Sequence, residues 1–187
     1  MQQIYLDNAA TTPVRPEVEE VMQPYFCEKY GNPSGIYKMA SECRQALETV
    51  RKQIGKTLKV SAEEIYFTSG GTESDNWAIK STAQRLKEKG KHIITSKIEH
   101  HAVLNSCAYL ETQGFEVTYL DVDEWGCVRF DALQRAIRKD TILISIMYAN
   151  NEVGTIQPIG QIGKIAKEND IFFHTDDVQA YGQIPID

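Results

Sequence analysis

The sequence predicts an α/β domain in which a mostly parallel sheet carries helices on both faces, giving three layers. Two observations predict this fold class. Short and almost wholly apolar runs alternate with amphipathic stretches along most of the chain, which is typical of parallel strands joined by crossover helices. No repeat, low-complexity tract or linker interrupts this alternation. The 187 residues are enough for one sizeable domain, or for part of a larger one.

The individual elements follow from the periodicity of apolar residues. Apolar runs predict strands at 64–69, 91–96, 115–122, 141–149 and 170–176. Amphipathic patterns predict helices at 15–28, 38–57, 72–89, 101–113, 131–138 and 159–169. The breaker-rich segment YGNPSG separates the first two helices. We expect Asp131 to cap the N-terminus of the fifth helix and Gly114 to end the fourth.

Charge and composition exclude several classes of function. The formal net charge is −6 and no block of basic residues occurs, which disfavours nucleic-acid binding. No apolar run is long enough to span a bilayer, and the N-terminus lacks the features of a signal peptide. The 4 cysteines are scattered without a C-x-x-C pair. They indicate reduced, packed thiols in a cytoplasmic protein rather than disulfides or a metal site.

The stretch FTSGGTESDNWAIK places glycines and small hydroxyl residues between an apolar run and a helix. Gly70 and Gly71 permit a close approach of the backbone to a ligand. A helix that begins there directs free N–H groups and the positive end of its dipole toward that ligand. Together with Thr72 and Ser74, these glycines predict an anion site.

Polar residues recur in the loops that follow other predicted strands. Ligands of parallel sheets bind beyond the carboxyl ends of the strands, where such loops meet. Turn chemistry alone explains any one of these loops, but several loops with unusual residues at the same edge predict a site. The residues concerned are His100 and His101 in SKIEHH, Asn150 and Asn151 in YANNEVG, and Asp176, Asp177 and Gln179 in HTDDVQ.

Two kinds of site use these residue types. Histidine and aspartate are common zinc ligands, but His100 and His101 are adjacent and no H-x-x-x-H or H-x-x-E-H spacing occurs. A carboxylate at a strand end, opposite a ring-stacking histidine and an anion site, fits a phosphorylated aromatic cofactor better. Pyridoxal phosphate needs these parts, because a carboxylate that keeps the ring nitrogen protonated makes the ring an electron sink.

Longer motifs then indicate a family. The segments YLDNAATTP, GNPS, FTSGGTESDNWAIK, HIITSKIEHHAVL, NNEVGTIQPI and FHTDDVQAYGQIPID resemble the amino-terminal half of the cysteine desulfurases. These are fold-type I pyridoxal-phosphate enzymes of the class V aminotransferase group. The resemblance runs from about residue 3 to the final residue. It implies that residues 15–187 form the amino-terminal part of the cofactor-binding large domain, and that residues 1–14 reach the active site.

The resemblance implies a role for each matching residue. Gly71 and Thr72 hold the cofactor phosphate, and a helix N-cap at Thr72 is compatible with that role. His100 stacks on the pyridine ring and is the catalytic group that helps proton transfer. Asp176 pairs with the ring nitrogen.

Further matches concern the substrate and the ring oxygen. Asn151 lies near the phenolic oxygen of the cofactor and the substrate carboxylate, and Gln179 donates to the phenolic oxygen. Ala10 and Thr11 line the substrate side. Structural roles are expected for His101 at the surface, for Asn150 in shaping its turn, and for Glu73 and Asp75 in the first turn of their helix.

The chain departs from the family pattern at three places. Gly35 and Tyr37 replace a serine and a histidine of the G-N-P-S-S-x-H pattern. Asp177 replaces a small residue, and it should point away from the ring because neighbours on an extended strand face opposite sides. The cofactor-binding lysine and the nucleophilic cysteine match positions beyond Asp187. We therefore expect a fragment that is inactive alone and binds the cofactor non-covalently or not at all.

The activity implied is the release of sulfur from L-cysteine, which leaves alanine and an enzyme persulfide. The resemblance also implies a homodimeric transferase that passes sulfur to an acceptor or to a scaffold protein of iron–sulfur cluster assembly. Two alternatives stay open. One is selenocysteine lyase or another class V enzyme, and the other is a non-catalytic cofactor-binding or interaction module of the same fold.

Overall fold

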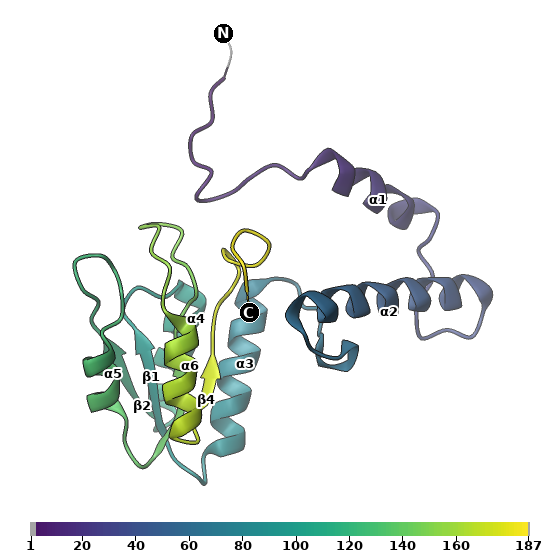
Figure 1. Cartoon of the computed structure of the whole chain (residues 1–187). Coiled ribbons are helices and arrows are strands. Elements are labelled where there is room, and N and C mark those ends of the chain that lie inside the picture. The colour runs from purple at the N-terminus through teal and green to yellow at the C-terminus, as the bar shows by residue number, and fades with distance from the viewer. Residues whose placement is uncertain (1–2, 187) are drawn as a thin grey trace. The chain divides into compact units, whose positions relative to one another are not determined.

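The computed structural model describes residues 3–186, which form two compact units, residues 3–67 and residues 68–186. The first unit contains the elements coloured purple to blue in Figure 1: α1 (Pro16–Cys27), α2 (Lys38–Leu58) and η1 (Ala62–Glu64). α1 begins with a proline, whose fixed φ suits the first helical position. Both predicted helices of this region are confirmed.

The strand predicted at 64–69 is wrong. Residues 65–68 form no ladder with any strand within residues 3–186. A β-strand exists only where a neighbouring strand pairs with its backbone N–H and C=O groups. Here Ile65 O accepts from Arg51 Nε at 3.3 Å, and the Tyr66 side chain is exposed. The apolar run at 64–69 therefore forms no strand, because no strand within the described residues pairs with it.

The second unit is a parallel α/β sheet. Its elements in chain order are α3 (Gly71–Leu86), β1 (His92–Ser96), α4 (His101–Thr112), β2 (Glu116–Leu120), α5 (Phe130–Ala136), β3 (Thr141–Ser145), α6 (Ile159–Glu168) and β4 (Phe172–His174). The strands are ordered β2-β1-β3-β4, and every pairing is parallel. Each strand-to-strand connection passes through a helix, as parallel neighbours require.

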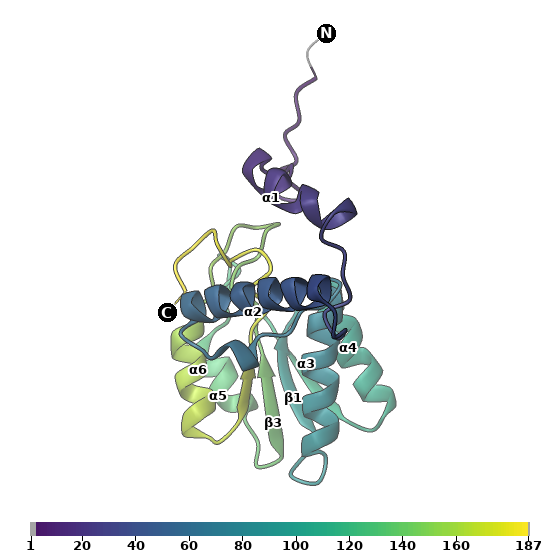
Figure 2. The same ribbon diagram turned by 90° about the vertical axis from the view of Figure 1, so that its right-hand side faces the viewer.

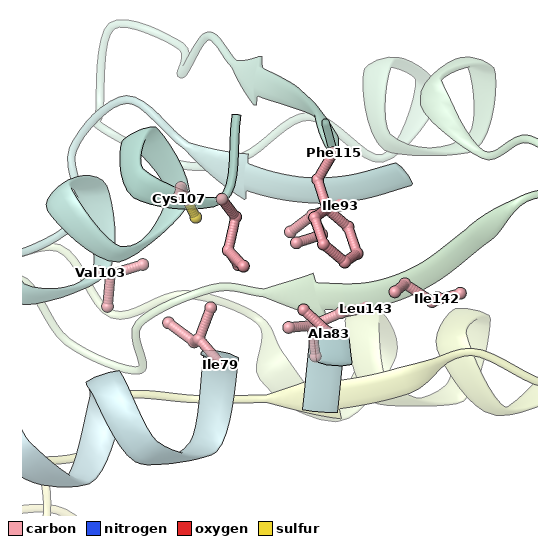
Figure 3. Packing of buried hydrophobic residues seen from close by; sticks show 9 residues of the cluster. Ile79, Ala83, Ile93, Val103, Cys107, Phe115, Ile142 and Leu143 are labelled. Atoms are coloured by element: carbon pink, nitrogen blue, oxygen red, sulfur yellow. The ribbon is translucent and has the colours of Figure 1, made fainter. Parts of the chain in front are cut away.

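Helices cover both faces of this sheet, and each face has its own apolar core. Because neighbouring strand residues point to opposite faces, Ile93 joins one core and Ile94 the other. Figure 2 shows α5 and α6 on one side of the strands and α3 and α4 on the other. The core beneath α3 and α4 is drawn in Figure 3, where Ile79, Ala83, Val103, Cys107, Phe115, Ile142 and Leu143 surround Ile93. The predicted three-layer fold class is confirmed.

The predicted stop of α4 is confirmed. Gly114 has a φ of 81°, and Phe115 N–H donates to Leu110 O at 3.1 Å. This geometry is a Schellman motif, in which a left-handed residue closes the helix and satisfies its last carbonyl groups. Glycine suits this position because it has no Cβ to clash in that conformation.

The capping role predicted for Asp131 is wrong. α5 begins at Phe130, and Arg129 is its N-cap residue. The Asp131 carboxylate accepts from the Arg129 Nε at 3.1 Å and from the Arg135 Nη1 at 2.9 Å. Asp131 therefore pairs with guanidinium groups in the first turn rather than with the free amides of the helix.

Three other predictions concern membrane spans, cysteines and domain boundaries. No helix within residues 3–186 is long and apolar enough to cross a membrane. All 4 cysteines are free, and Cys43 and Cys107 are buried, as expected of packed thiols. The division into a segment at 1–14 and a domain at 15–187 stays a prediction, and residues 1, 2 and 187 lie outside the described part of the chain.

Candidate functional site

The loops after β1, β3 and β4 meet at the carboxyl edge of the sheet, as the parallel topology predicts. Hydrogen bonds connect them directly. Asn150 Nδ2 donates to Ile98 O at 2.8 Å, and Tyr148 N–H donates to Asp176 O at 3.0 Å. Asn150 Oδ1 also accepts from two amides of its own turn. The expectation that Asn150 shapes its turn is confirmed.

The N-terminus of α3 provides the geometry of an anion site. Gly70 is the N-cap, and the Glu73 and Ser74 amides donate to its carbonyl oxygen. Within residues 3–186, no acceptor pairs with the amides of Gly71 or Thr72. These amides are open at the positive end of the helix dipole, where anions bind. The N-cap predicted at Thr72 is wrong, because the helix begins at Gly71 and its N-cap is Gly70.

Two contacts hold this helix terminus. The exposed Glu73 carboxylate accepts from the Ser69 hydroxyl at 2.7 Å and from the Ser69 amide at 2.6 Å, and these bonds lower the Glu73 pKa. Glu73 thus has the first-turn role expected of it. On the side of β4, a Cβ added to Gly71 would lie 2.5 Å from Val178 Cγ2. Glycine at position 71 therefore permits α3 to meet the turn after β4.

His100 is the N-cap residue of α4. Its Nδ1 accepts from the Ala102 amide at 3.1 Å, so the neutral ring carries its proton on Nε2. The bond orients the imidazole at the carboxyl edge of the sheet. His101 is the first helical residue, with its ring edge-on to His100 at 6.1 Å between centroids.

Asp75, His100 and Asp176 form the centre of the candidate site. One carboxylate oxygen of each aspartate and one ring nitrogen of His100 lie within 4.8 Å of one another. The residues come from α3, the start of α4 and the turn after β4. Asp176 is buried, and its Oδ1 accepts from Val178 N–H at 2.9 Å. The sequence predicted His100 and Asp176 for this site, and the structure brings them together.

Asp75 is the site residue that the sequence interpretation missed. It is only 4% exposed, and within residues 3–186 no hydrogen bond reaches its Oδ2. Burial, and then the charge of Asp176, raise the pKa of Asp75 to about 7. A role in the first turn of α3 is wrong, because Asp75 is the fifth residue of the helix. Its spacing was a usable signal, since residues four apart, such as Gly71 and Asp75, lie on the same side of a helix.

Two further groups, half-buried His174 and buried Glu99, lie beside the cluster. His174 pairs with Ser145 in the register of β4 and β3, and Ser145 Oγ lies 2.9 Å from His174 Nδ1. Burial lowers the His174 pKa and so favours the neutral imidazole. Glu99 accepts from the Ser96 hydroxyl at 2.6 Å and from the Met147 amide at 3.0 Å. Burial raises the Glu99 pKa to about 7.

Asp177 is held by a turn and not by a strand. β4 ends at His174, so the regular strand expected around Asp177 is wrong, and alternation along a strand does not decide its direction. Asp177 Oδ1 accepts from Thr175 Oγ1 at 3.2 Å. Within the described residues, Asp177 is not a member of the cluster formed by Asp75, His100 and Asp176.

The other predicted residues have definite places but untested roles. Asn151 lies in the turn after β3, and Gln179 lies in an exposed turn after β4. Ala10 and Thr11 are exposed residues of the first unit. Their roles toward cofactor and substrate stay predictions.

The chemistry of the site fits a cationic ring that carries an anionic group. The open amides of Gly71 and Thr72 suit a phosphate. The Asp176 carboxyl group makes the region beside it acidic, which suits a protonated ring nitrogen. Carboxylates and an imidazole are also zinc ligands. A zinc ion, however, would not provide an acceptor for the open amides of Gly71 and Thr72. The arrangement therefore favours pyridoxal phosphate.

Comparison with known proteins shows the class to which the chain belongs. The model of the aminotransferase class-V family matches residues 4–187, and the chain is a member of that family. One curated relative is the cysteine desulfurase IscS of Methanosarcina thermophila, which is 64% identical over 184 residues. This match covers 98% of the chain and 46% of the relative. The chain thus spans about half the length of the curated relatives it matches.

Solved structures show the same relationship. A NifS-like protein superposes with a TM-score of 0.95 at 43% identity, over 99% of this chain and 51% of that one. A structure described as SspA in complex with cysteine superposes with a TM-score of 0.92 at 44% identity, over 96% of this chain and 52% of that one. The fold described above is therefore that of NifS-like proteins.

Proposed function

We propose that the protein is a cysteine desulfurase, which uses pyridoxal phosphate to take sulfur from L-cysteine and leaves alanine and an enzyme persulfide. One observation carries the proposal: the open amides of α3 and the cluster of His100 and Asp176 share one edge of the sheet. The choice of substrate is supported by a relative named as a cysteine desulfurase and by the neighbour in complex with cysteine.

Residues of the second unit supply the groups that hold the cofactor. The amides of Gly71 and Thr72, with the Thr72 hydroxyl, bind the phosphate. Asp176 would pair with the ring nitrogen and keep it protonated, and His100 would cover the ring, where the resemblance assigns it to proton transfer. When bound, the cofactor supplies an electron sink. Asn151 and Gln179 have been assigned to its phenolic oxygen by resemblance, as Ala10 and Thr11 have been to the substrate side.

The biological setting is inferred from the relatives. We infer a homodimer in the cytoplasm that delivers sulfur to an acceptor protein, or to a scaffold for iron–sulfur cluster assembly. The name IscS of the curated relatives supports the link to iron–sulfur cluster assembly, and the homodimer and the cytoplasm are inferred from the resemblance alone. The acidic balance of the chain, with a net charge of −6, is consistent with a protein or small-molecule partner rather than a nucleic acid.

The test separates activity from cofactor binding. Because the chain spans about half of its relatives, the assay uses the product of the complete reading frame, incubated with pyridoxal phosphate and L-cysteine. We expect equimolar alanine and sulfide in the presence of a thiol reductant. The 187-residue chain alone is assayed in parallel for non-covalent binding, by equilibrium dialysis of the cofactor.

Two other results favour the alternatives. A strong preference for selenocysteine over cysteine indicates selenocysteine lyase. Cofactor binding without any alanine indicates a non-catalytic module of the same fold. Absence of both binding and alanine formation rejects the proposed function.

A further inference from the structure

The unpartnered oxygen of Asp75 is the one buried side-chain atom without a hydrogen bond in the described part of the chain. The Asp75 side chain is 5% exposed, and its other oxygen, Oδ1, lies 3.6 Å from His174 Nε2. An unsatisfied polar atom in a buried position costs free energy unless a partner or a ligand compensates for it. The position of Asp75 Oδ2 therefore requires an explanation.

Within residues 3–186, the groups that face Asp75 include no lysine or arginine. They are His174 and Asp176 from β4 and its turn, His100 from the start of α4, and Glu99 from the loop after β1. Two of them are carboxyl groups, and burial lowers the pKa of His174, which favours its neutral imidazole. A buried carboxyl group beside another one takes up a proton instead of remaining charged. The raised pKa of Asp75, about 7, agrees with this expectation.

Asp75 also joins α3 to the segment that carries Asp176. Gly71 and Asp75 are four residues apart and lie on the same side of the helix. Near Gly71 the helix meets Val178, and near Asp75 it meets His174 and Asp176. The helix that presents the anion site therefore meets the Asp176 segment at two successive turns.

We propose that Asp75 acts as a neutral hydrogen-bonding group that positions Asp176, and not as a second negative charge. Its Oδ1 faces His174 Nε2 at 3.6 Å, and its O–H is directed toward the Asp176 carboxylate. Asp75 is then a positioning residue, and Asp176 alone carries the charge that meets the cofactor ring nitrogen. The identity of this ligand rests on the proposed function.

This arrangement gives α3 a second task. Its N-terminus holds the phosphate at Gly71 and Thr72, and its fifth residue sets the carboxylate that receives the ring nitrogen. The separation between these two binding points is then determined by one rigid element. A shift of the Asp176 turn relative to α3 should weaken binding even when each group is intact.

Asparagine distinguishes a neutral hydrogen-bonding group from a charge, because its amide offers an acceptor and donors like a protonated carboxyl group. Kd for pyridoxal phosphate is measured by equilibrium dialysis with the 187-residue chain. We expect Asp75→Asn to bind within about twofold of the wild type, whereas Asp75→Ala and Asp176→Asn bind about tenfold more weakly. Asp170→Asn is the matched control, since that carboxylate is 95% exposed and precedes β4.

A second measurement needs no cofactor. The Val178 amide donates to Asp176 Oδ1, so its hydrogen exchange reports the position of Asp176. We expect exchange to accelerate about tenfold in Asp75→Ala and to stay unchanged in Asp75→Asn. Amides of β1 and β3 serve as the folding control in the same spectra.

Each outcome decides the proposal. Equal losses of affinity in Asp75→Asn and Asp176→Asn overturn it, because Asp75 then acts through its charge. Unchanged binding and exchange in Asp75→Ala also overturn it. If the wild type does not bind pyridoxal phosphate, the proposed function fails for this chain while Val178 exchange still tests the positioning role. If Asp75→Ala does not fold, wild-type behaviour of Asp75→Asn supports the proposal.

Discussion

Replacing Gly90 by alanine tests the packing at the amino-terminal edge of the sheet. Gly90 precedes β1, and a Cβ added to it would lie 2.2 Å from Asp140 O and 2.7 Å from Asp140 C. These are backbone atoms, which cannot rotate out of the way. Asp140 O also accepts from His92 N–H at 3.0 Å, at the first residue of β1. Moving Asp140 therefore weakens strand pairing as well.

The expected loss of stability has two parts. Overpacking in a folded protein costs about 1–3 kcal/mol, and weakening one backbone hydrogen bond costs about 0.5–1.5 kcal/mol. We expect Gly90→Ala to lower the free energy of unfolding of the second unit by about 2–4 kcal/mol. With a urea m-value of about 2 kcal/mol/M, the midpoint should fall by about 1–2 M.

Urea unfolding is followed by circular dichroism and by tryptophan fluorescence. Both tryptophans, Trp77 and Trp125, lie in residues 68–186, so fluorescence reports the second unit. Gly160→Ala is the matched control, because nothing lies within 4 Å of the added Cβ. Gly160 is in the first turn of α6, where alanine should be neutral or stabilise by up to about 1 kcal/mol. Equal midpoints for the two variants would refute the close approach of Gly90 to Asp140.

Three further predictions test the site. Thr72→Val removes a hydroxyl but keeps the shape of the side chain. It should weaken the binding of inorganic phosphate about three- to tenfold, measured by NMR titration of the α3 amides. An unchanged Kd would contradict the anion site. In the product of the complete reading frame, Asp176→Ala should abolish cysteine-dependent alanine formation while Asp177→Ala retains most of it; the reverse pattern would reject the assignment of Asp176. Because burial raises the pKa of Asp75 and Glu99 to about 7, the folded protein holds protons there that the unfolded chain has released. Their contribution to stability is therefore present below about pH 4 and is lost as the pH rises from about 4 to about 7. Asp75→Asn should remove about half of that slope in urea unfolding at several pH values, and an unchanged slope would show that Asp75 does not titrate in this range.

Most elements of the fold could be predicted because their signals are local. The apolar run at 141–149 and the amphipathic pattern at 159–169 correspond to β3 and α6, since periodicity records which sides of an element are buried. Gly114 could be predicted as a helix stop because a left-handed residue after a helix favours glycine. Asp131 misled the prediction, because an aspartate near a helix start suits a cap and an ion pair equally well.

Some residues of the candidate site could also be predicted from the sequence, and one could not. His100 and Asp176 could be predicted because each follows an apolar run, and the carboxyl ends of parallel strands share an edge. Asp75 could not be separated from an ordinary polar residue of a helix, because its burial depends on the distant segment around His174. The burial and the pKa of an ionisable residue can be assigned only when the groups around it are known.

The sequence by itself determined the alternation of helices and strands, the loops that carry polar chemistry, and the resemblance to a family. These depend on side-chain periodicity and on residues close in the chain. Only the tertiary structure decided that residues 65–68 pair with no strand among the described residues, that Gly71 and Thr72 keep open amides, and that Asp75 lies beside Asp176. Backbone pairing and the pKa of a buried carboxyl group both depend on atoms far away in sequence, which chain folding brings together.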